Sequence, residues 1–377
     1  MSSSASRSFR PSLWRLAFYS LLSLVVSRRR PLKAHQQHGV SSGAGSTLST
    51  DKPKQVQQQR AQEHGRGRKA SSPWQIPWQG WKDIFWRTYA EIQDDRLVAV
   101  AAGVVFYALL AIFPAITAIV SLYGLFTDVA TINEHLSLAA GFLPQGALDI
   151  IRDQVNRITS KGDAKLGLAF IFGLGLALWS ANAGMKAIID ALNVVYDETE
   201  KRGFIKLNLI SLTLTLAAIL SLLLAIAAVV VLPLLLGFVG LDGVGELLLR
   251  ILRWPALFVL IIIGLAVLYR FGPSRTKAQW QWLSVGSVFA AIAWLIASAL
   301  LSWYLANFAN YDATYGSLGA GIGLMMWLWI SSLVVLLGAQ LNSEIEHQTT
   351  RDSTVGSENP IGTRGTAMAD TVGAAAD

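Results

Sequence analysis

The chain of 377 residues contains no cysteine and few charged residues. Without cysteine it can form no disulfide and has no thiolate metal ligand or cysteine nucleophile. Asp, Glu, Lys and Arg make up 15% of the residues, whereas soluble domains usually carry about 25%. Mean hydropathy is +0.45. Together these values disfavour a soluble enzyme, a disordered scaffold and a nucleic-acid module with a conventional core.

Histidine is also scarce, and its spacing does not suit a metal site. The five histidines follow no His-x-His or His-Glu-x-x-His pattern. They are His35, His38, His64, His135 and His347. No Walker-type phosphate loop occurs. The Gly-x-Gly at 173–175 lies within an apolar segment, where close helix packing explains it. The sequence therefore predicts no catalytic residues, no metal and no cofactor, and a protein that is not an enzyme.

The basic charge is concentrated near the N-terminus. Residues 1–96 hold 16 Lys/Arg against 6 Asp/Glu. Such an excess suits anionic lipid headgroups, nucleic acid or a solvated cytoplasmic tail. Residues 1–72 are rich in Gln, Ser and Gly, so we predict a basic, largely disordered tail. Its apolar run at 13–26 is too short to cross a bilayer, and we expect no nucleic-acid partner.

Six long apolar segments follow and predict an all-α, polytopic membrane protein with six transmembrane helices between residues 97 and 346. A Trp-rich segment at 73–96 precedes them and favours an amphipathic, interfacial position. Residues 347–377 read as a disordered tail. The flanking Lys and Arg residues predict that both termini are cytoplasmic. The expected spans cover 97–126, 166–185, 207–236, 247–269, 283–308 and 315–341.

Polar side chains near the cytoplasmic ends of these spans are the candidate functional residues, because each is costly in hydrocarbon. Lys186 and Asp190 are spaced to pair on one helix face. The group is interpreted either as a polar cavity open to the cytoplasm or as interfacial snorkelling and capping. Its members are Tyr107, Asn182, Lys186, Asp190, Asn193, Gln340, Asn342 and Glu344.

Small residues and prolines mark expected helix contacts. Small residues four positions apart let helix backbones approach closely, and proline within a span frees a backbone carbonyl. Two tyrosines accompany the glycine-rich start of the last span. The predicted packing or hinge positions are Gly103, Pro114, Pro233, Tyr311, Tyr315, Gly316, Gly319 and Gly323.

Several segments resemble the YihY/virulence factor BrkB family of bacterial inner-membrane proteins, once labelled ribonuclease BN. The resemblance covers roughly residues 80–346 and rests on AAGVVFYALLAIFP at 101–114, WSAN at 179–182, ALNVVY at 191–196, YRFGP at 269–273, NYDATYGSLGA at 310–320 and LGAQLNSE at 337–344. One departure is Gln340, where the family often has Glu. The resemblance implies a six-helix protein of the cytoplasmic membrane with no settled activity.

Three functions remain open at this point. Polar groups among closely packed, proline-containing helices favour transport or handling of a lipid-like or anionic amphiphile through a cavity. A non-catalytic scaffold for envelope integrity or serum resistance is the second hypothesis. A ribonuclease is the third and is disfavoured, because no metal cluster or positioned acid–base pair is visible. The expected partners are membrane lipids, and a homo-oligomer is left open.

Overall fold

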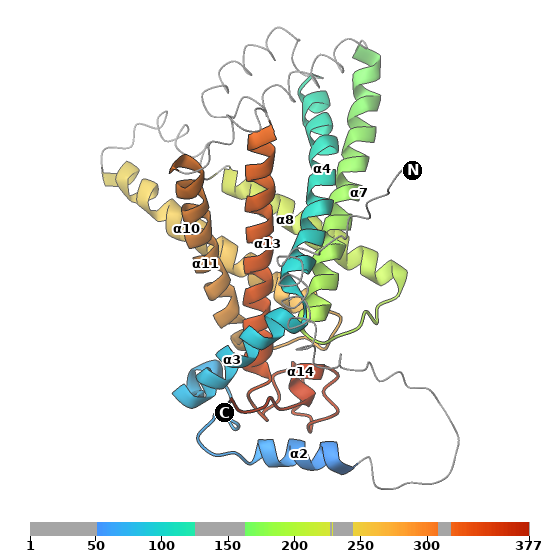
Figure 1. Ribbon diagram of the computed structural model, residues 1–377. Coiled ribbons are helices and arrows are strands. Elements are labelled where there is room, and N and C mark those ends of the chain that lie inside the picture. Colours follow the sequence, from blue (N-terminus) through green and yellow to red (C-terminus); the bar gives the residue numbers. More distant parts are fainter. Residues whose placement is uncertain (1–50, 125–162, 227, 229–243, 308–317, 377) are drawn as a thin grey trace, which may run out of the picture. The chain divides into compact units, whose positions relative to one another are not determined.

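The computed structural model describes residues 51–124, 163–226, 228, 244–307 and 318–376 (Figure 1). Within these ranges the ordered elements are helices. One isolated antiparallel β-bridge pairs Ala278, just before α11, with Thr354 in the C-terminal segment. Pro233, Tyr311, Tyr315, Gly316 and the predicted tail up to residue 50 lie outside the described residues.

Six long helices form the apolar part of the described chain. They are α4 (Leu97–Gly124), α7 (Asp163–Val195), α8 (Phe204–Ile226), α10 (Val244–Phe271), α11 (Trp280–Asn307) and α13 (Leu318–Glu346). All but α4 contain a stretch long and apolar enough to cross a bilayer, at Ile171–Val195, Phe204–Ala225, Ile251–Phe271, Trp280–Leu305 and Gly321–Glu346. Helices suit this setting because every backbone polar group must be satisfied without water.

Helix α13 packs against α4, α7 and α11, and α4 runs along α7 (Figure 1). Polar side chains join these helices at a few points. The Tyr269 hydroxyl donates to the Val335 carbonyl at 2.7 Å. The Trp294 indole donates to the Ser331 hydroxyl at 2.9 Å. Such bonds hold neighbouring helices in one register where the surrounding side chains are uniformly apolar.

Helices α11 and α13 cross closely at Gly286 and Gly338. A Cβ added at Gly286 would overlap the Gly338 carbonyl, and one added at Gly338 would lie 2.6 Å from both the Gly286 carbonyl and the Ala290 methyl. The Asn342 side chain closes the crossing, because its Oδ1 accepts the Gly286 amide at 2.8 Å and its Nδ2 donates to the Leu283 carbonyl at 3.2 Å. Glycine is therefore required at both positions.

The predicted packing positions only partly match this arrangement. Gly103 has open space where a Cβ would lie, so it makes no close helix contact among the described residues. A Cβ at Gly323 would make only an ordinary contact, 3.5 Å from Leu305. Gly319 lies near the start of α13, and α4 continues through position 114 as one helix, so the role of Pro114 as a hinge stays a prediction. Gly286 and Gly338 are 52 residues apart in the sequence, so no local pattern identifies their contact.

Gly286→Ala should destabilise the protein by about 1–3 kcal/mol, because the added methyl forces two helix backbones apart. Gly103→Ala is the matched control in another apolar helix and should leave stability unchanged or slightly raised, since alanine is the better helix former. Thermal unfolding of the detergent-solubilised variants measures both. Equal melting temperatures would show that the crossing is not close-packed.

Both tails differ from the predicted disorder where the structure describes them. Residues 51–61 form α2 (Asp51–Ala61), followed by a 3-10 turn (Pro73–Gln75), and the C-terminal segment includes α14 (Ala367–Asp370). These segments have no large apolar core, and hydrogen bonds from buried arginines stabilise them instead. Arg364 donates to four backbone carbonyls, those of Thr350, Arg351, Asn359 and Ala369. Composition suggested disorder because it counts apolar side chains and misses such hydrogen bonds.

Helix α3 (Trp78–Asp94) and the 3-10 turn before it hold the Trp-rich segment. Trp74, Trp78 and Phe85 are at least half exposed, whereas Trp81 packs against a small apolar cluster that includes the fully buried Ile84. The opposite face holds Asp83, which is buried and pairs with Arg66 at 2.6 Å. The interfacial position of this helix stays a prediction, and its exposed aromatic face is what that position requires.

Candidate functional site

The three polar residues predicted to share one face of α7, Asn182, Lys186 and Asp190, have different surroundings. The Lys186 ammonium donates to Asn208 Oδ1 on α8 at 2.6 Å. Asp190 is exposed, and among the described residues the expected ion pair between Lys186 and Asp190 does not form. The Asn182 side-chain oxygen is buried and has no described hydrogen-bond partner. Tyr107 on α4 is 39% exposed and lies beside Gly184 of α7.

The predicted polar residues at the end of α13 are buried and have mostly structural contacts. Asn342 belongs to the helix crossing described above. The Glu344 carboxylate accepts the Arg87 Nε at 2.5 Å, which ties α13 to α3. Gln340 is fully buried, and neither of its amide atoms has a hydrogen-bond partner among the described residues.

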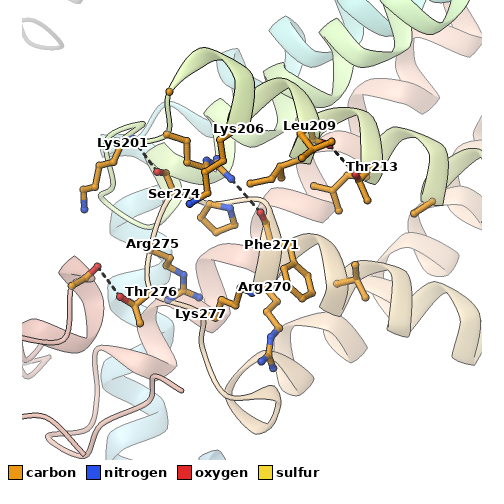
Figure 2. Close-up of a pocket in the computed structure, with 18 residues that line it drawn as sticks. Lys201, Lys206, Leu209, Thr213, Arg270, Phe271, Ser274, Arg275, Thr276 and Lys277 are labelled. Carbon is orange, nitrogen blue, oxygen red and sulfur yellow. Dashed lines mark hydrogen bonds between the residues drawn. The ribbon is translucent and has the colours of Figure 1, made fainter. Parts of the chain in front are cut away.

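A pocket that the sequence analysis did not identify lies where α8 begins and α10 ends, with a volume of about 830 Å³. Figure 2 shows side chains of α8 on one side and those of the α10 end and the following loop on the other. None of the eight predicted polar residues lines it. Its charged lining consists of six cations and no acid among the described residues: Lys201, Arg202, Lys206, Arg270, Arg275 and Lys277.

Asn193 joins the two loops that form the rim of this pocket. Its Nδ2 donates to Glu200 at 3.2 Å, and its Oδ1 accepts the Ser274 amide at 2.7 Å. Arg202 then reaches the end of α10 and donates to the carbonyls of Phe271 and Gly272 at 3.3 and 2.8 Å. These contacts fix the spacing of the two basic loops, so Asn193 has a positioning role outside the pocket itself.

Three of the six cations are paired with carboxylates that lie behind the pocket lining. Lys201 pairs with Glu198 at 2.7 Å, Arg202 with Glu200 at 2.7 Å, and Arg275 with Glu346 at 2.8 Å. Burial acts to raise the pKa of Glu200, but hydrogen bonds from Arg202 and Asn193 outweigh it and lower the pKa to about 2. That carboxylate is therefore ionised at neutral pH and neutralises its arginine.

The other three cations have no acidic partner among the described residues. Lys206, in the first turn of α8, is one of them. The Arg270 guanidinium lies 4.2 Å from the centre of the Trp280 ring, and its Nε and Nη1 are buried without a hydrogen-bond partner. The Lys277 ammonium lies 5.0 Å from the centre of the Phe271 ring. The pocket therefore carries a surplus of about three positive charges.

The helical part of the lining is mainly apolar and lies on the same two helices as Lys206 and Arg270. It includes Leu209, Ile210, Leu214 and Ala217 of α8 and Val267 of α10, with Thr213 as a polar member. Leu209 is 64% exposed, as expected for a side chain that faces lipid. An anion with an apolar tail fits such a combination of cations and hydrocarbon.

The signal for this pocket was present in the sequence. Lys201, Arg202 and Lys206 precede one apolar segment, and Arg270, Arg275 and Lys277 follow the next. The sequence analysis used these residues only to predict topology. The two triplets meet because α8 and α10 are antiparallel, so that the start of α8 lies beside the end of α10. Among the described residues, no group of three or more His, Asp or Glu could hold a metal ion.

Glu346→Gln should lower stability by about 3–5 kcal/mol, because Arg275 would remain fully buried with its charge no longer compensated. The matched control is Glu358→Gln, which removes an exposed pair with Arg351 and should cost less than about 1 kcal/mol. Thermal or denaturant unfolding in detergent separates the two. Similar losses in both variants would contradict a structural role for the buried pair.

The helices and the basic pocket define an all-helical, polytopic membrane protein. The chain belongs to the virulence factor BrkB family, whose model matches residues 88–360. A relative from Bacillus subtilis, named a ribonuclease-like protein (YfkH), is 32% identical over 64% of this chain and 88% of its own length. UPF0761 membrane proteins of Haemophilus influenzae and Aeromonas salmonicida are 24% and 25% identical, over 70% and 67% of this chain and 94% and 85% of theirs. No solved structure matches.

Proposed function

We propose that this membrane protein binds and handles an anionic amphiphile, which enters at the pocket between α8 and α10. The observation that carries the proposal is that three cations without an acidic partner line one pocket together with apolar side chains of α8 and α10. The pocket lies at the ends of two candidate spans, Phe204–Ala225 and Ile251–Phe271. Headgroups of anionic lipids occupy this depth, where each nearby Lys or Arg contributes roughly 1 kcal/mol of attraction.

The proposed location is the bacterial cytoplasmic membrane, with α4 as a sixth span and both termini in the cytoplasm. Contacts at the polar ends of the helices support this topology. Arg87 before α4 contacts Glu344 at the end of α13, Asn193 at the end of α7 contacts Ser274 after α10, and Gln279 before α11 contacts Ser353 after α13. The starts of α4 and α11 therefore lie on the same side as the ends of α7, α10 and α13, which is the arrangement expected if the chain crosses the membrane six times. The basic residues gathered there favour the cytoplasmic side.

Cysteine accessibility tests this topology without a background, because the chain has no native cysteine. Thr199→Cys, between α7 and α8, and Thr363→Cys, in the C-terminal segment, should react with an impermeant maleimide only in inside-out vesicles. Ser137→Cys, between the first and second predicted spans, should react only from the outer face. Labelling of all three from one face would refute the six-span arrangement.

Lipid binding tests the function itself. Lys206→Gln combined with Lys277→Gln should weaken binding of an anionic phospholipid by about 30-fold, because two cations worth about 1 kcal/mol each are lost. Lys69→Gln combined with Lys82→Gln removes the same charge from exposed positions away from the pocket. Affinities of the purified variants for fluorescent phosphatidylglycerol and phosphatidylcholine in nanodiscs give the comparison.

Equal affinity in the two double variants would mean that attraction to the lipid surface is general and the pocket has no role. The scaffold hypothesis predicts instead that neither double variant changes lipid affinity and that the anionic lipid is not preferred.

A further inference from the structure

We infer that the pocket between α8 and α10 selects a phosphomonoester, a group that carries two negative charges, over a singly charged phosphodiester. This inference rests on the proposed function and specifies the chemistry of the headgroup. Six cations line the pocket, and the three carboxylates behind them are Glu198, Glu200 and Glu346. A singly charged headgroup would leave about two positive charges of the surplus uncompensated.

The start of α8 adds to this positive potential. Lys201, Gly203 and Lys206 line the pocket, and the first turn of α8 contains no acidic residue. A helix of 23 residues carries a partial positive charge at this end, where the first backbone amides have no partner within the helix. Phosphate oxygens are acceptors that satisfy such amides. The helix end alone would identify no ligand, but here it coincides with the unpaired cations.

Arg270 adds charge to the pocket but no free hydrogen-bonding fork. Its Nε and Nη1 are buried without a hydrogen-bond partner, and the Trp280 ring lies against the guanidinium group. Atoms that are closed to solvent while the pocket is empty cannot contact a ligand in it, and Figure 2 shows the Arg270 side chain directed away from Lys206. Arg270 therefore acts on a bound anion through its positive charge, which attracts a doubly charged group more strongly than a singly charged one.

The size of the pocket indicates more than a free phosphate. A volume of about 830 Å³ exceeds what a headgroup phosphate fills, and the lining also includes several apolar side chains of α8. Leu209 and Leu214 would contact the first part of an acyl chain while the phosphate lies near Lys206 and Lys277. The same phosphomonoester chemistry also describes inorganic phosphate, so the experiment must distinguish a lipid from a soluble source.

The experiment compares nanodiscs that contain equal fractions of phosphatidic acid or phosphatidylglycerol, with the purified full chain at pH 7.5 and pH 5.5. At pH 7.5 phosphatidic acid should bind about fivefold more tightly, as expected for one further charge near the surface cations. The second ionisation of a phosphomonoester has a pKa near 6, so this preference should shrink at pH 5.5. Phosphatidylglycerol keeps one charge at both pH values and reports any titration of the protein.

Two variants locate the preference in the pocket. Lys206→Gln and Lys277→Gln each remove one cation without an acidic partner, so each should weaken binding of phosphatidic acid more than binding of phosphatidylglycerol. Lys69→Gln, away from the pocket, should alter neither. An intact melting temperature in the two pocket variants identifies a loss of selectivity as local.

Each outcome has one meaning. A preference at pH 7.5 that fades at pH 5.5 supports a phosphomonoester site. If inorganic phosphate at millimolar concentration displaces phosphatidic acid completely, the same chemistry serves a soluble ligand. Equal binding of both anionic lipids overturns this inference and leaves the proposed function standing. Binding of neither anionic lipid above phosphatidylcholine overturns the proposed function as well.

Discussion

Charged side chains cannot remain in hydrocarbon without compensation, and this constraint organises the described structure. Arginines and carboxylates gather at one end of the helices and neutralise one another there. The Arg87–Glu344 and Arg275–Glu346 pairs are deeply buried and link α13 to α3 and to the loop after α10. The segments around these pairs need little apolar surface of their own, because buried arginines such as Arg364 satisfy their carbonyls.

The helices themselves are ordered by a different kind of contact. Lipid tails are as apolar as leucine, so association within the bilayer depends on close packing and on a few hydrogen bonds. The crossing of Gly286 and Gly338 provides the first, and Asn342 provides the second at the same place. Because Asn342 lies two residues before Glu344, the tight crossing and the ionic layer form one continuous unit at the end of α13. The loop that carries Arg275 and Lys277 is held against this unit.

The sequence predicts the helical class, and the five candidate spans found in the structure overlap five of the six predicted segments, because long apolar stretches depend on local composition. It does not predict contacts between distant positions. Gly286 and Gly338, or the two basic triplets around α8 and α10, come together only when the helices are placed side by side. The polar residues were chosen from the sequence because such side chains are costly in lipid. Several of them, such as Asn193 and Asn342, are accounted for by structural hydrogen bonds.

Gln340 is an uncharged residue among the buried ion pairs at the end of α13. It is fully buried beside the tight crossing, and its amide has no partner among the described residues, whereas Glu344 four residues later is paired with Arg87. A carboxylate at position 340, as the family resemblance suggests is common, would need a cation or a proton there. The amide removes that requirement, so position 340 adds no charge to the ionic layer at the end of α13.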